Sequence, residues 1–548
     1  MAKPTRLTQE MIDEYVARGL WSKDGIDQVL RQNALEYPNK EAIVDSKRRL
    51  TWSELDNVVD RVALGLMRRG IERDQALIAQ IPSSTTSIIL LLACHRAGIL
   101  CCLAPLTFRQ KEMAHLFKTL GAAAVLTPER YRDLDFLDMV KNADSGPGHL
   151  RQFFVTGEEA PLGAFPFKVL ETTPIEGEVH EADFEKRAFG PFEVSSIVLS
   201  SGTTGMPKCI EHTGASSLAG GRGVVMMAEL TREEVMGNIA PLSGGPGLQN
   251  WWACLQIGAR MCLLERFTPD GALDLIQRER VTYLSAIPTQ LVRILKECDL
   301  SKYDLSPLRI VRTGAAALDA SLGMEIEQKL SCKVLVAGGS QETYSFAQSG
   351  VNDTLEKRIK TLGRPFPGNE IKIGDENGNS LPPGQVGELY VRGASTSSGY
   401  YGDRDATLAA WGALGKEGWY NTGDLAKIDE DGFLVLVGRK KEIIIRGGQN
   451  IYPKEIEELL CTHPKVVQAV VLGVPDTVMG ERACACVVLA EGEKMELGEM
   501  TDFLRNMGLA VHKLPERLEI FEKFPQLAEG QKVDRRSLKE QVLERLKG

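Results

Sequence analysis

Hydrophobic and polar positions alternate regularly between about residues 40 and 340. Short apolar runs separated by amphipathic stretches predict buried strands at EAIVD, ALIAQI, AAAVLT, RQFFVTG, SSIVLSS, ARMCLLE, TYLSAI, LRIVRTG and CKVLVAG. The stretch TWSELDNVVDRVALGLMRRG (51–70) predicts a helix that begins with a capping box of Thr51 and Glu54. Strands that alternate with helices in this way predict an α/β fold with a largely parallel sheet.

The pattern changes after about residue 365. Turn residues at short spacing, Asn377–Gly378 and Pro382–Gly384, predict antiparallel strands in a small β-barrel-like region. The charged segment GRKKE (438–442) then precedes a part in which strand and helix patterns mix. We therefore expect a large N-terminal domain, residues 1–440, and a small α+β C-terminal domain, residues 441–548, joined by a hinge.

Composition narrows the class of protein. The chain has 548 residues, 43% of them hydrophobic and 25% charged, and a net charge of −9, which disfavours a general nucleic-acid binder. The most apolar stretch, 87–106, is interrupted by His95 and Arg96, so a buried helix and strand are favoured over a membrane span. Eleven cysteines without a CxxC pair or a zinc spacing predict reduced thiols in a cytoplasmic protein.

The stretch SSGTTGMPK (200–208) carries candidate phosphate chemistry. It differs from a P-loop, because Met206 and Pro207 separate the second glycine from Lys208 and Cys209 follows the lysine. It still offers glycines for close backbone approach, hydroxyl groups, and one cation for an oligophosphate. It follows the predicted strand SSIVLS, at the edge where open α/β sheets bind ligands. On composition alone, a plain surface loop remains the alternative.

Other motifs follow in a fixed order. They are GAAAL (314–318), GGSQET (338–343), GELYVRG (387–393), GWYNTGDLAKIDEDGFLVLVGRKKEII (418–444), IYPKEIEELL (451–460) and KLPERLEIFEKFPQLAEGQKVDRRSL (513–538). With 200–208, this set resembles the acyl-adenylate-forming superfamily, which includes AMP-forming acyl- and aryl-CoA synthetases, from about residue 28 onward. The resemblance implies that a carboxylic acid reacts with ATP to give acyl-AMP and pyrophosphate, and that a thiol then displaces AMP.

The resemblance also implies roles for individual residues. Catalytic roles fall to Lys208, Gln341, Glu342 and Lys532, and Glu342 is in addition the expected Mg²⁺ ligand. Contacts with ATP or AMP are implied for Ser200, Ser201, Gly202, Thr203, Thr204, Gly205, Gly314, Ala315, Ala316, Gly338, Gly339, Ser340, Asp424 and Arg439. Lys441 occupies the hinge position, and Gly447 and Gly448 are implied to contact coenzyme A.

Two departures from the superfamily pattern occur. Gln531 stands where a glycine usually precedes the catalytic lysine, and Pro525 lies seven residues before Lys532, so one residue is inserted. Loops accept such insertions at little cost, and we expect Lys532 to keep its role. In the other departure, Gly338 replaces the aromatic residue that would cover adenine, and Gln341 replaces a threonine, although its amide can still donate a hydrogen bond.

The stretch GNIAPLSGGPGLQNWW (237–252) is implied to form the acyl pocket. Its lining residues would be Ile239, Ala240, Pro241, Leu242, Ser243, Gly244 and Gly245. Ile239 stands where hydroxybenzoate enzymes have an asparagine, and 238–252 contains no charged residue, which disfavours hydroxybenzoates and amino acids. The prediction is an apolar acid, cyclic by preference, with a medium chain left open. Trp251 and Trp252 could form a wall of the pocket or belong to the core.

The acceptor thiol and the assembly remain open at this point. Because no fused carrier domain is seen after KVDRRSL, free coenzyme A is the expected acceptor, and a separate carrier protein is the alternative. A nucleotide- or acyl-binding protein without catalysis is a further alternative on the same fold. A homodimer is one assembly that we leave open, and neither a nucleic acid nor a membrane span is expected.

Overall fold

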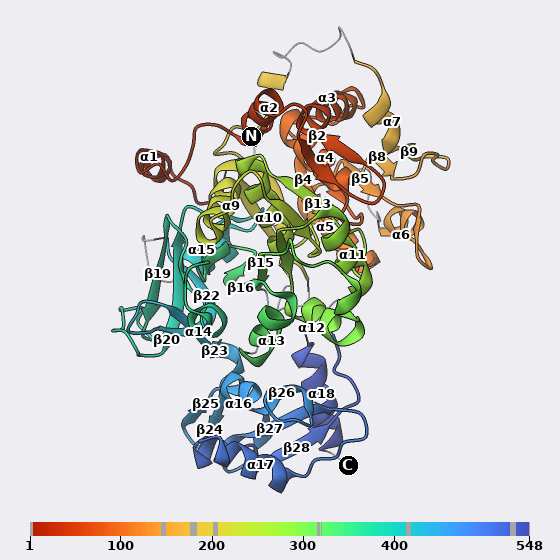
Figure 1. Cartoon of the computed structure of the whole chain (residues 1–548). Helices are drawn as coiled ribbons and strands as arrows, with labels where there is room; N and C mark the ends of the chain where they lie inside the picture. The colour runs from red at the N-terminus through yellow and green to blue at the C-terminus, as the bar shows by residue number, and fades with distance from the viewer. Residues whose placement is uncertain are drawn as a thin grey trace.

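The computed structural model describes residues 4–143, 150–175, 184–200, 206–314, 318, 320–412, 418–526 and 533–546. Two large sheets, a smaller antiparallel sheet and a C-terminal sheet form the framework of the molecule. Figure 1 shows the C-terminal part beneath the rest of the chain. Within the described ranges, no helix combines the length and the hydrophobicity that crossing a membrane would require.

The largest sheet has nine strands in the order β18-β17-β16-β15-β14-β12-β13-β1-β2. Its strands are β1 (Glu41–Val44), β2 (Arg49–Thr51), β12 (Val235–Asn238), β13 (Arg260–Leu263), β14 (Tyr283–Ala286), β15 (Ile310–Gly314), β16 (Lys333–Ser340), β17 (Tyr344–Gln348) and β18 (Arg364–Pro365). The strands from β16 to β1 pair in parallel, and the edges β2, β17 and β18 pair antiparallel.

The second sheet has eight strands in the order β21-β11-β10-β4-β3-β5-β8-β9. They are β3 (Ala76–Ala79), β4 (Leu100–Leu103), β5 (Ala124–Thr127), β8 (Gln152–Val155), β9 (Phe165–Pro166), β10 (Val194–Leu199), β11 (Cys209–Thr213) and β21 (Gly399–Tyr400). All nine apolar runs predicted from the sequence coincide with strands of these two sheets, and the largely parallel α/β fold is confirmed.

Helices fill the space between the two sheets. The main core joins residues of both sheets with α3 (Trp52–Arg68), α4 (Thr85–Ala97), α9 (Gly214–Ala228) and α10 (Gly245–Ile257). The predicted capping box begins α3: Thr51 Oγ1 accepts from the Glu54 N–H at 3.2 Å, and Glu54 accepts from the Thr51 N–H at 2.8 Å. Both faces of α4 are buried, as expected for an apolar helix that does not cross a membrane.

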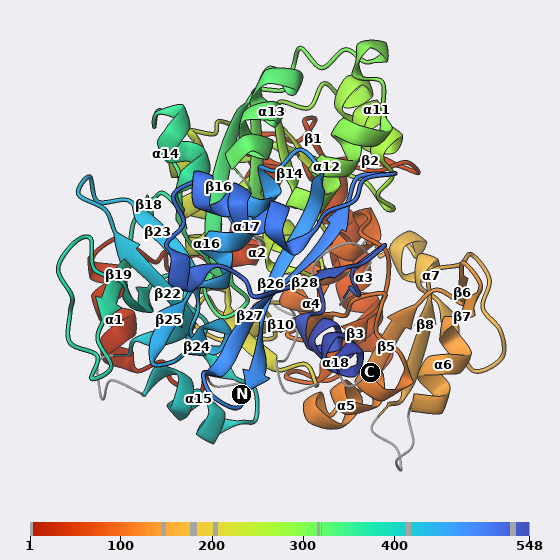
Figure 2. The same ribbon diagram turned by 90° about the horizontal axis from the view of Figure 1, so that it is seen from below.

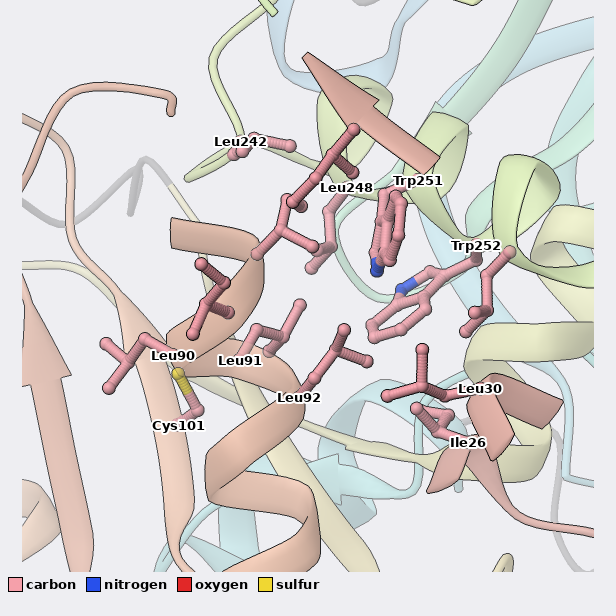
Figure 3. Packing of buried hydrophobic residues seen from close by; sticks show 14 of the residues in the cluster. Ile26, Leu30, Leu90, Leu91, Leu92, Cys101, Leu242, Leu248, Trp251 and Trp252 are labelled. Carbon is pink, nitrogen blue, oxygen red and sulfur yellow. The ribbon is translucent and has the colours of Figure 1, made fainter. Parts of the chain in front are cut away.

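Trp251 and Trp252 belong to this core. Both side chains are fully buried, and Trp251 stacks on Trp52 with ring centroids 6.2 Å apart. Figure 3 shows the two tryptophans among Leu30 and Leu92. Of the two interpretations left open by the sequence, core packing therefore describes both residues.

The outer faces of both sheets carry further helices. The nine-stranded sheet is covered by α11 (Pro269–Glu279), α12 (Pro288–Glu297) and α13 (Ala320–Leu330), and the eight-stranded sheet by α5 (Gln110–Leu120) and α6 (Phe136–Ala143). The remaining helices of this part are α1 (Gln9–Ala17), α2 (Ile26–Glu36), α7 (Phe167–Thr172), α14 (Leu355–Lys360) and α15 (Arg404–Trp411). Each sheet is thus covered on two faces, as expected for parallel strands.

The region predicted to be β-barrel-like forms an antiparallel sheet of four strands. They are β19 (Asn369–Gly374), β20 (Gly387–Gly393), β22 (Tyr420–Ile428) and β23 (Leu434–Arg439). The turn between β19 and β20 contains Gly378 and Gly384, both with positive φ, which explains the glycines in the two predicted turns.

The last part of the chain is a small α+β unit with cores of its own. Its strands are β24 (Ile444–Arg446), β25 (Gln449–Ile451), β26 (Val466–Asp476), β27 (Gly480–Leu489) and β28 (Arg517–Ile520), and its helices are α16 (Pro453–Cys461), α17 (Leu497–Asn506) and α18 (Arg535–Arg545). Figure 2 shows this unit in front of the rest of the molecule. Lys454 Nζ on α16 donates to the Leu436 carbonyl of β23 at 2.8 Å, one contact between the two parts.

All eleven cysteines are free thiols, and most are buried. Burial raises the pKa of Cys209 to about 12, so this thiol stays protonated at neutral pH. The cysteines therefore contribute apolar packing, as the absence of a CxxC pair predicts.

Candidate active site

The predicted nucleotide motifs follow strands of both large sheets. Gly314 ends β15, and Gly338, Gly339 and Ser340 form the end of its parallel neighbour β16. The apolar run CKVLVAG predicts a strand that ends at Gly338, whereas the strand in the structure continues through Ser340. Gly339 makes this possible, because a Cβ there would lie 2.2 Å from the Tyr344 carbonyl oxygen.

Part of the predicted phosphate loop can be located. Ser200 directly follows β10, and its N–H donates to the Lys208 carbonyl at 3.1 Å, so the loop begins and ends at paired strands β10 and β11. Ser201, Gly202, Thr203, Thr204 and Gly205 lie outside the described residues, as do Ala315, Ala316 and Lys532. Their predicted roles therefore stay predictions.

Glu342, Lys208 and Tyr400 are held together. Tyr400 donates its hydroxyl hydrogen to Glu342 Oε1 at 3.0 Å, and both side chains are buried. The exposed Lys208 places Nζ 4.5 Å from the centre of the Tyr400 ring. The Glu342 carbonyl accepts from the Ser397 N–H at 2.7 Å, which ties the end of the β16–β17 hairpin to the segment that enters β21. Tyr400 thus contacts both Glu342 and Lys208, the carboxylate and the cation to which the resemblance gives catalytic roles in the reaction with ATP.

Two phenols surround the Glu342 carboxylate. Burial and then the negative charge of Glu342 raise the pKa of Tyr400 well above its usual range, and the same two causes raise the pKa of Tyr420. Both phenols therefore stay protonated at neutral pH and act as donors. A carboxylate with donors on one side keeps its remaining lone pairs for a cation.

Gln341 connects the Glu342 segment to α10 and β11. Its Oε1 accepts from the Gly245 N–H at 2.9 Å, so the side chain reaches the first residue of α10. Its carbonyl oxygen lies 2.8 Å from His212 Nε2, and burial lowers the pKa of His212 to about 4. The neutral ring therefore donates from Nε2 to this carbonyl. The predicted acyl loop and the predicted catalytic segment are adjacent as a result.

The predicted acyl loop is mostly packed. Ile239 joins the hydrophobic cluster on the outer face of the nine-stranded sheet, and Ala240 and Leu242 are also buried. The Leu242 N–H donates to Ser83 Oγ at 2.9 Å, which fixes the loop against the residues before α4. A cavity of about 10 Å³, lined in part by Leu242, Ser243 and Leu248, has room for one water molecule.

Asp424 and Arg439 form an ion pair on neighbouring strands. They are register partners on β22 and β23, and Arg439 Nε lies 3.0 Å from Asp424 Oδ1. Lys441 follows in a short 3₁₀ turn (Lys440–Glu442) and is exposed. Partial desolvation and then the positive charge of Arg439 lower the pKa of Lys441. The three residues therefore lie where the four-stranded sheet ends and the C-terminal unit begins.

Gly447 and Gly448 form the turn between β24 and β25. Both have positive φ and are exposed, and the Gly447 N–H donates to the Met479 carbonyl at 2.8 Å. This turn belongs to the C-terminal unit, whereas Glu342 and Lys208 belong to the two large sheets.

Sequence reasoning missed three residues of this region. Tyr400 lies seven residues after GELYVRG, and only the pairing of β11 with β21 brings it to Lys208. His212 lies four residues after Lys208 and contacts Gln341 only in the folded chain. Arg312 is a fully buried cation on β15. The charged residue in the apolar run LRIVRTG could have revealed it. Among the described residues, no group of three or more His, Cys, Asp or Glu side chains is arranged to hold a metal ion.

Comparisons with known proteins cover almost the whole chain. The sequence model of the AMP-binding enzyme family matches residues 30–401, and that of the AMP-binding enzyme C-terminal domain matches residues 455–531. The chain is 29% identical to the 2,3-dihydroxybenzoate-AMP ligase of Bacillus subtilis (strain 168), covering 98% of this chain and 97% of that protein. It is 30% identical to the medium-chain fatty-acid–CoA ligase of Escherichia coli (strain K12), covering 97% and 93%.

Solved structures share the fold. The crystal structure of ATP-bound MatB from Rhodopseudomonas palustris superimposes with a TM-score of 0.83 at 25% identity, covering 94% of this chain and 99% of that one. The match spans both the large sheets and the C-terminal unit.

Proposed function

Since the chain belongs to the AMP-binding enzyme family and is an adenylate-forming acid ligase, we propose that it is an acid–CoA ligase. In the first half-reaction a carboxylate oxygen attacks the α-phosphorus of ATP, and pyrophosphate leaves. In the second, the thiol sulfur attacks the acyl carbon, and AMP leaves with the bridging oxygen. The thiol gives up its proton, so one acid, one ATP and one thiol give one thioester, AMP and pyrophosphate.

The contact of Glu342 with Tyr400 and of Tyr400 with Lys208 carries this proposal. Lys208 would hold the departing phosphates, together with the hydroxyl groups of 200–204. Gln341 would donate to the α-phosphate or to the attacking carboxylate from its amide nitrogen, because its Oε1 is already bonded to Gly245. A carboxylate that approaches a triphosphate meets like charge, and such groups offset that repulsion where charge develops.

Mg²⁺ fits this set of donors. It prefers oxygen ligands and is commonly bound by one or two carboxylates together with phosphate oxygens and water. Glu342 is one carboxylate whose orientation the Tyr400 hydroxyl fixes, and Lys208 lies over the ring of the same tyrosine. Glu342 would therefore be the protein ligand of the ion, which would neutralise phosphate charge.

The remaining roles concern the ribose and the movement of the C-terminal unit. Asp424 would accept hydrogen bonds from the ribose hydroxyls, and its partner Arg439 would assist there. The domains would divide after residue 440, with Lys441 as the hinge at the 3₁₀ turn. Rotation there would exchange Lys532, needed for adenylation, for the turn of Gly447 and Gly448, which would contact coenzyme A.

The acid would have a cyclic, mainly apolar skeleton. Support comes from the burial of the apolar residues Ala240 and Leu242 in the predicted acyl loop, and from Gly245, whose lack of a side chain lets Gln341 approach this loop closely. A medium-chain acid is the second choice, since one relative is named a medium-chain fatty-acid–CoA ligase.

A panel of carboxylic acids tests the proposal. Each acid is incubated with ATP, Mg²⁺ and coenzyme A, and AMP and thioester are measured together. The proposal predicts equal amounts of both products with at least one cyclic acid. Acid-dependent exchange of pyrophosphate into ATP without any thioester would instead favour loading of a separate carrier protein, an alternative supported by the relative named as an AMP ligase. Failure of every acid to drive either reaction would refute both.

A further inference from the structure

Arg312 is a buried guanidinium whose hydrogen bonds within the described part of the chain go to neutral side chains. Its exposed fraction is 2%, and burial lowers its pKa. Nε donates to Gln348 Oε1 at 2.6 Å, and Nη2 donates to Gln249 Oε1 at 3.0 Å and to Ser345 Oγ at 2.5 Å. Among the described residues, no acidic group pairs with it and neither N–H of Nη1 has an acceptor. A desolvated cation held only by neutral groups is costly, and an anion would offset that cost.

Further buried polar groups surround this cation. Asn238, Ser285 and Arg312 are register partners on β12, β14 and β15, so their side chains share one face of the sheet. That face is the inner one, since Met236, two residues before Asn238, belongs to the main core. Helix α10 packs over it.

Asn238, Ser285, Arg312, Gln348 and Gln249 form a buried polar layer between the sheet and α10, and two polar atoms of this layer have no hydrogen-bond partner among the described residues. They are Asn238 Oδ1 and Gln348 Nε2. Buried polar atoms are nearly always paired, so a set of unpaired ones indicates a ligand or ordered water. The layer carries one positive charge and unused donors at Arg312 Nη1 and Gln348 Nε2, which complement a carboxylate, whereas Asn238 Oδ1 is an acceptor.

The layer lies one helical turn below the candidate site. Gly245 at the start of α10 bonds to Gln341, and Gln249, four residues later, accepts from the Ser345 N–H at 3.2 Å. The two contacts therefore lie about 6 Å apart along the helix at 1.5 Å per residue. That separation is of the order of one ring or a short carbon chain.

We propose that Arg312 binds a second acidic group at the far end of the substrate, so that the preferred substrate is a compact dicarboxylic acid. This inference rests on the proposed ligase function. It keeps the apolar skeleton of the proposed acid and adds a second carboxylate at the end of that skeleton far from the reacting group. The reacting carboxylate would lie beside Gln341, and the second one would accept from the two N–H groups of Arg312 Nη1.

Matched pairs of acids test this inference. Acid-dependent exchange of pyrophosphate into ATP is measured with benzoate, isophthalate and terephthalate, and with butyrate, succinate and glutarate. We expect the wild-type kcat/KM for the best dicarboxylate to exceed that of its matched monocarboxylate about tenfold or more. Arg312→Gln should lower the dicarboxylate value about 10- to 100-fold, the range expected when charged hydrogen bonds are lost, and change the monocarboxylate value less than about threefold. Arg312→Lys should retain part of the preference.

Two controls separate the possible failures. Arg293→Gln removes an exposed arginine that pairs with Glu297 on α12, and it should leave both values unchanged. Terephthalate with a non-hydrolysable ATP analogue should raise the Tm of the wild type more than that of Arg312→Gln. If Arg312→Gln does not fold, the wild-type ratio of kcat/KM between each dicarboxylate and its matched monocarboxylate tests the inference. Monocarboxylates preferred by the wild type would overturn this inference alone, whereas no exchange with any acid would overturn the ligase function and this inference with it.

Discussion

Tyr400→Phe removes one oxygen from the candidate active site and separates two contacts of the same ring. The hydroxyl donates to Glu342 at 3.0 Å, and the ring face lies 4.5 Å from Lys208 Nζ. Phenylalanine keeps the ring and loses the hydrogen bond. A hydrogen bond to a charged group contributes about 1.5–3 kcal/mol, and loss of a group that orients a metal ligand costs about 10- to 100-fold in metal affinity.

The assay is acid-dependent exchange of pyrophosphate into ATP at increasing Mg²⁺. Tyr400→Phe should raise the Mg²⁺ concentration for half-maximal rate about 10- to 100-fold, with a smaller change in the KM for the acid. Tyr400→Leu should also raise the KM for ATP, because Lys208 loses the ring face. Tyr401→Phe is the matched control on the neighbouring residue. An unchanged Mg²⁺ dependence in Tyr400→Phe would refute the role of Glu342 as the ligand that Tyr400 orients.

Three further predictions concern other parts of the chain. Burial lowers the pKa of His212 to about 4 in the folded chain, against about 6.5 when unfolded, so between these values only the unfolded state binds the proton and the free energy of unfolding falls as pH drops. His212→Gln should remove up to about 3 kcal/mol of this loss, as measured by urea unfolding at pH 4.5 and 7.5. An unchanged pH dependence of the free energy of unfolding would contradict this prediction. Arg96 is fully buried and forms ion pairs with Asp27, Asp56 and Asp60. Arg96→Met should lower the free energy of unfolding by about 3–5 kcal/mol, because three carboxylates lose their buried cation, and a loss below about 1 kcal/mol would contradict this. Lys532→Ala should abolish acyl-AMP formation and spare thioester formation from supplied acyl-AMP, and normal adenylation would exclude that role.

Much of the fold could be predicted because its signals are local. The nine apolar runs from EAIVD to CKVLVAG match nine of the strands between β1 and β16, and Thr51 with Glu54 begins α3 as the capping box predicts. The order of strands within each sheet could not be predicted. Neighbours such as β11 and β21 are almost two hundred residues apart, and no periodicity in the chain encodes that pairing.

The candidate site likewise contains residues that local motifs predict and residues that only the fold reveals. Glu342, Lys208 and Asp424 stand in recognisable motifs, and the structure gives Glu342 and Asp424 contacts with other chemistry-bearing residues. Tyr400 and His212 reach the site only through tertiary pairing, so no local pattern indicated them. Residues 238–252 contain no charged side chain, and Arg312 reaches α10 only in the folded chain, because this helix packs against strands from later in the sequence.

Transfer of a carboxylate oxygen to AMP tests the central claim most directly. The best acid of the panel is labelled with ¹⁸O in its carboxylate and incubated with ATP, Mg²⁺ and coenzyme A, and the products are analysed by mass spectrometry. An acid that attacks the α-phosphorus and is then displaced by a thiol must leave one labelled oxygen in the phosphate of each AMP and none in pyrophosphate. Unlabelled AMP, or label in pyrophosphate or inorganic phosphate, would contradict the account.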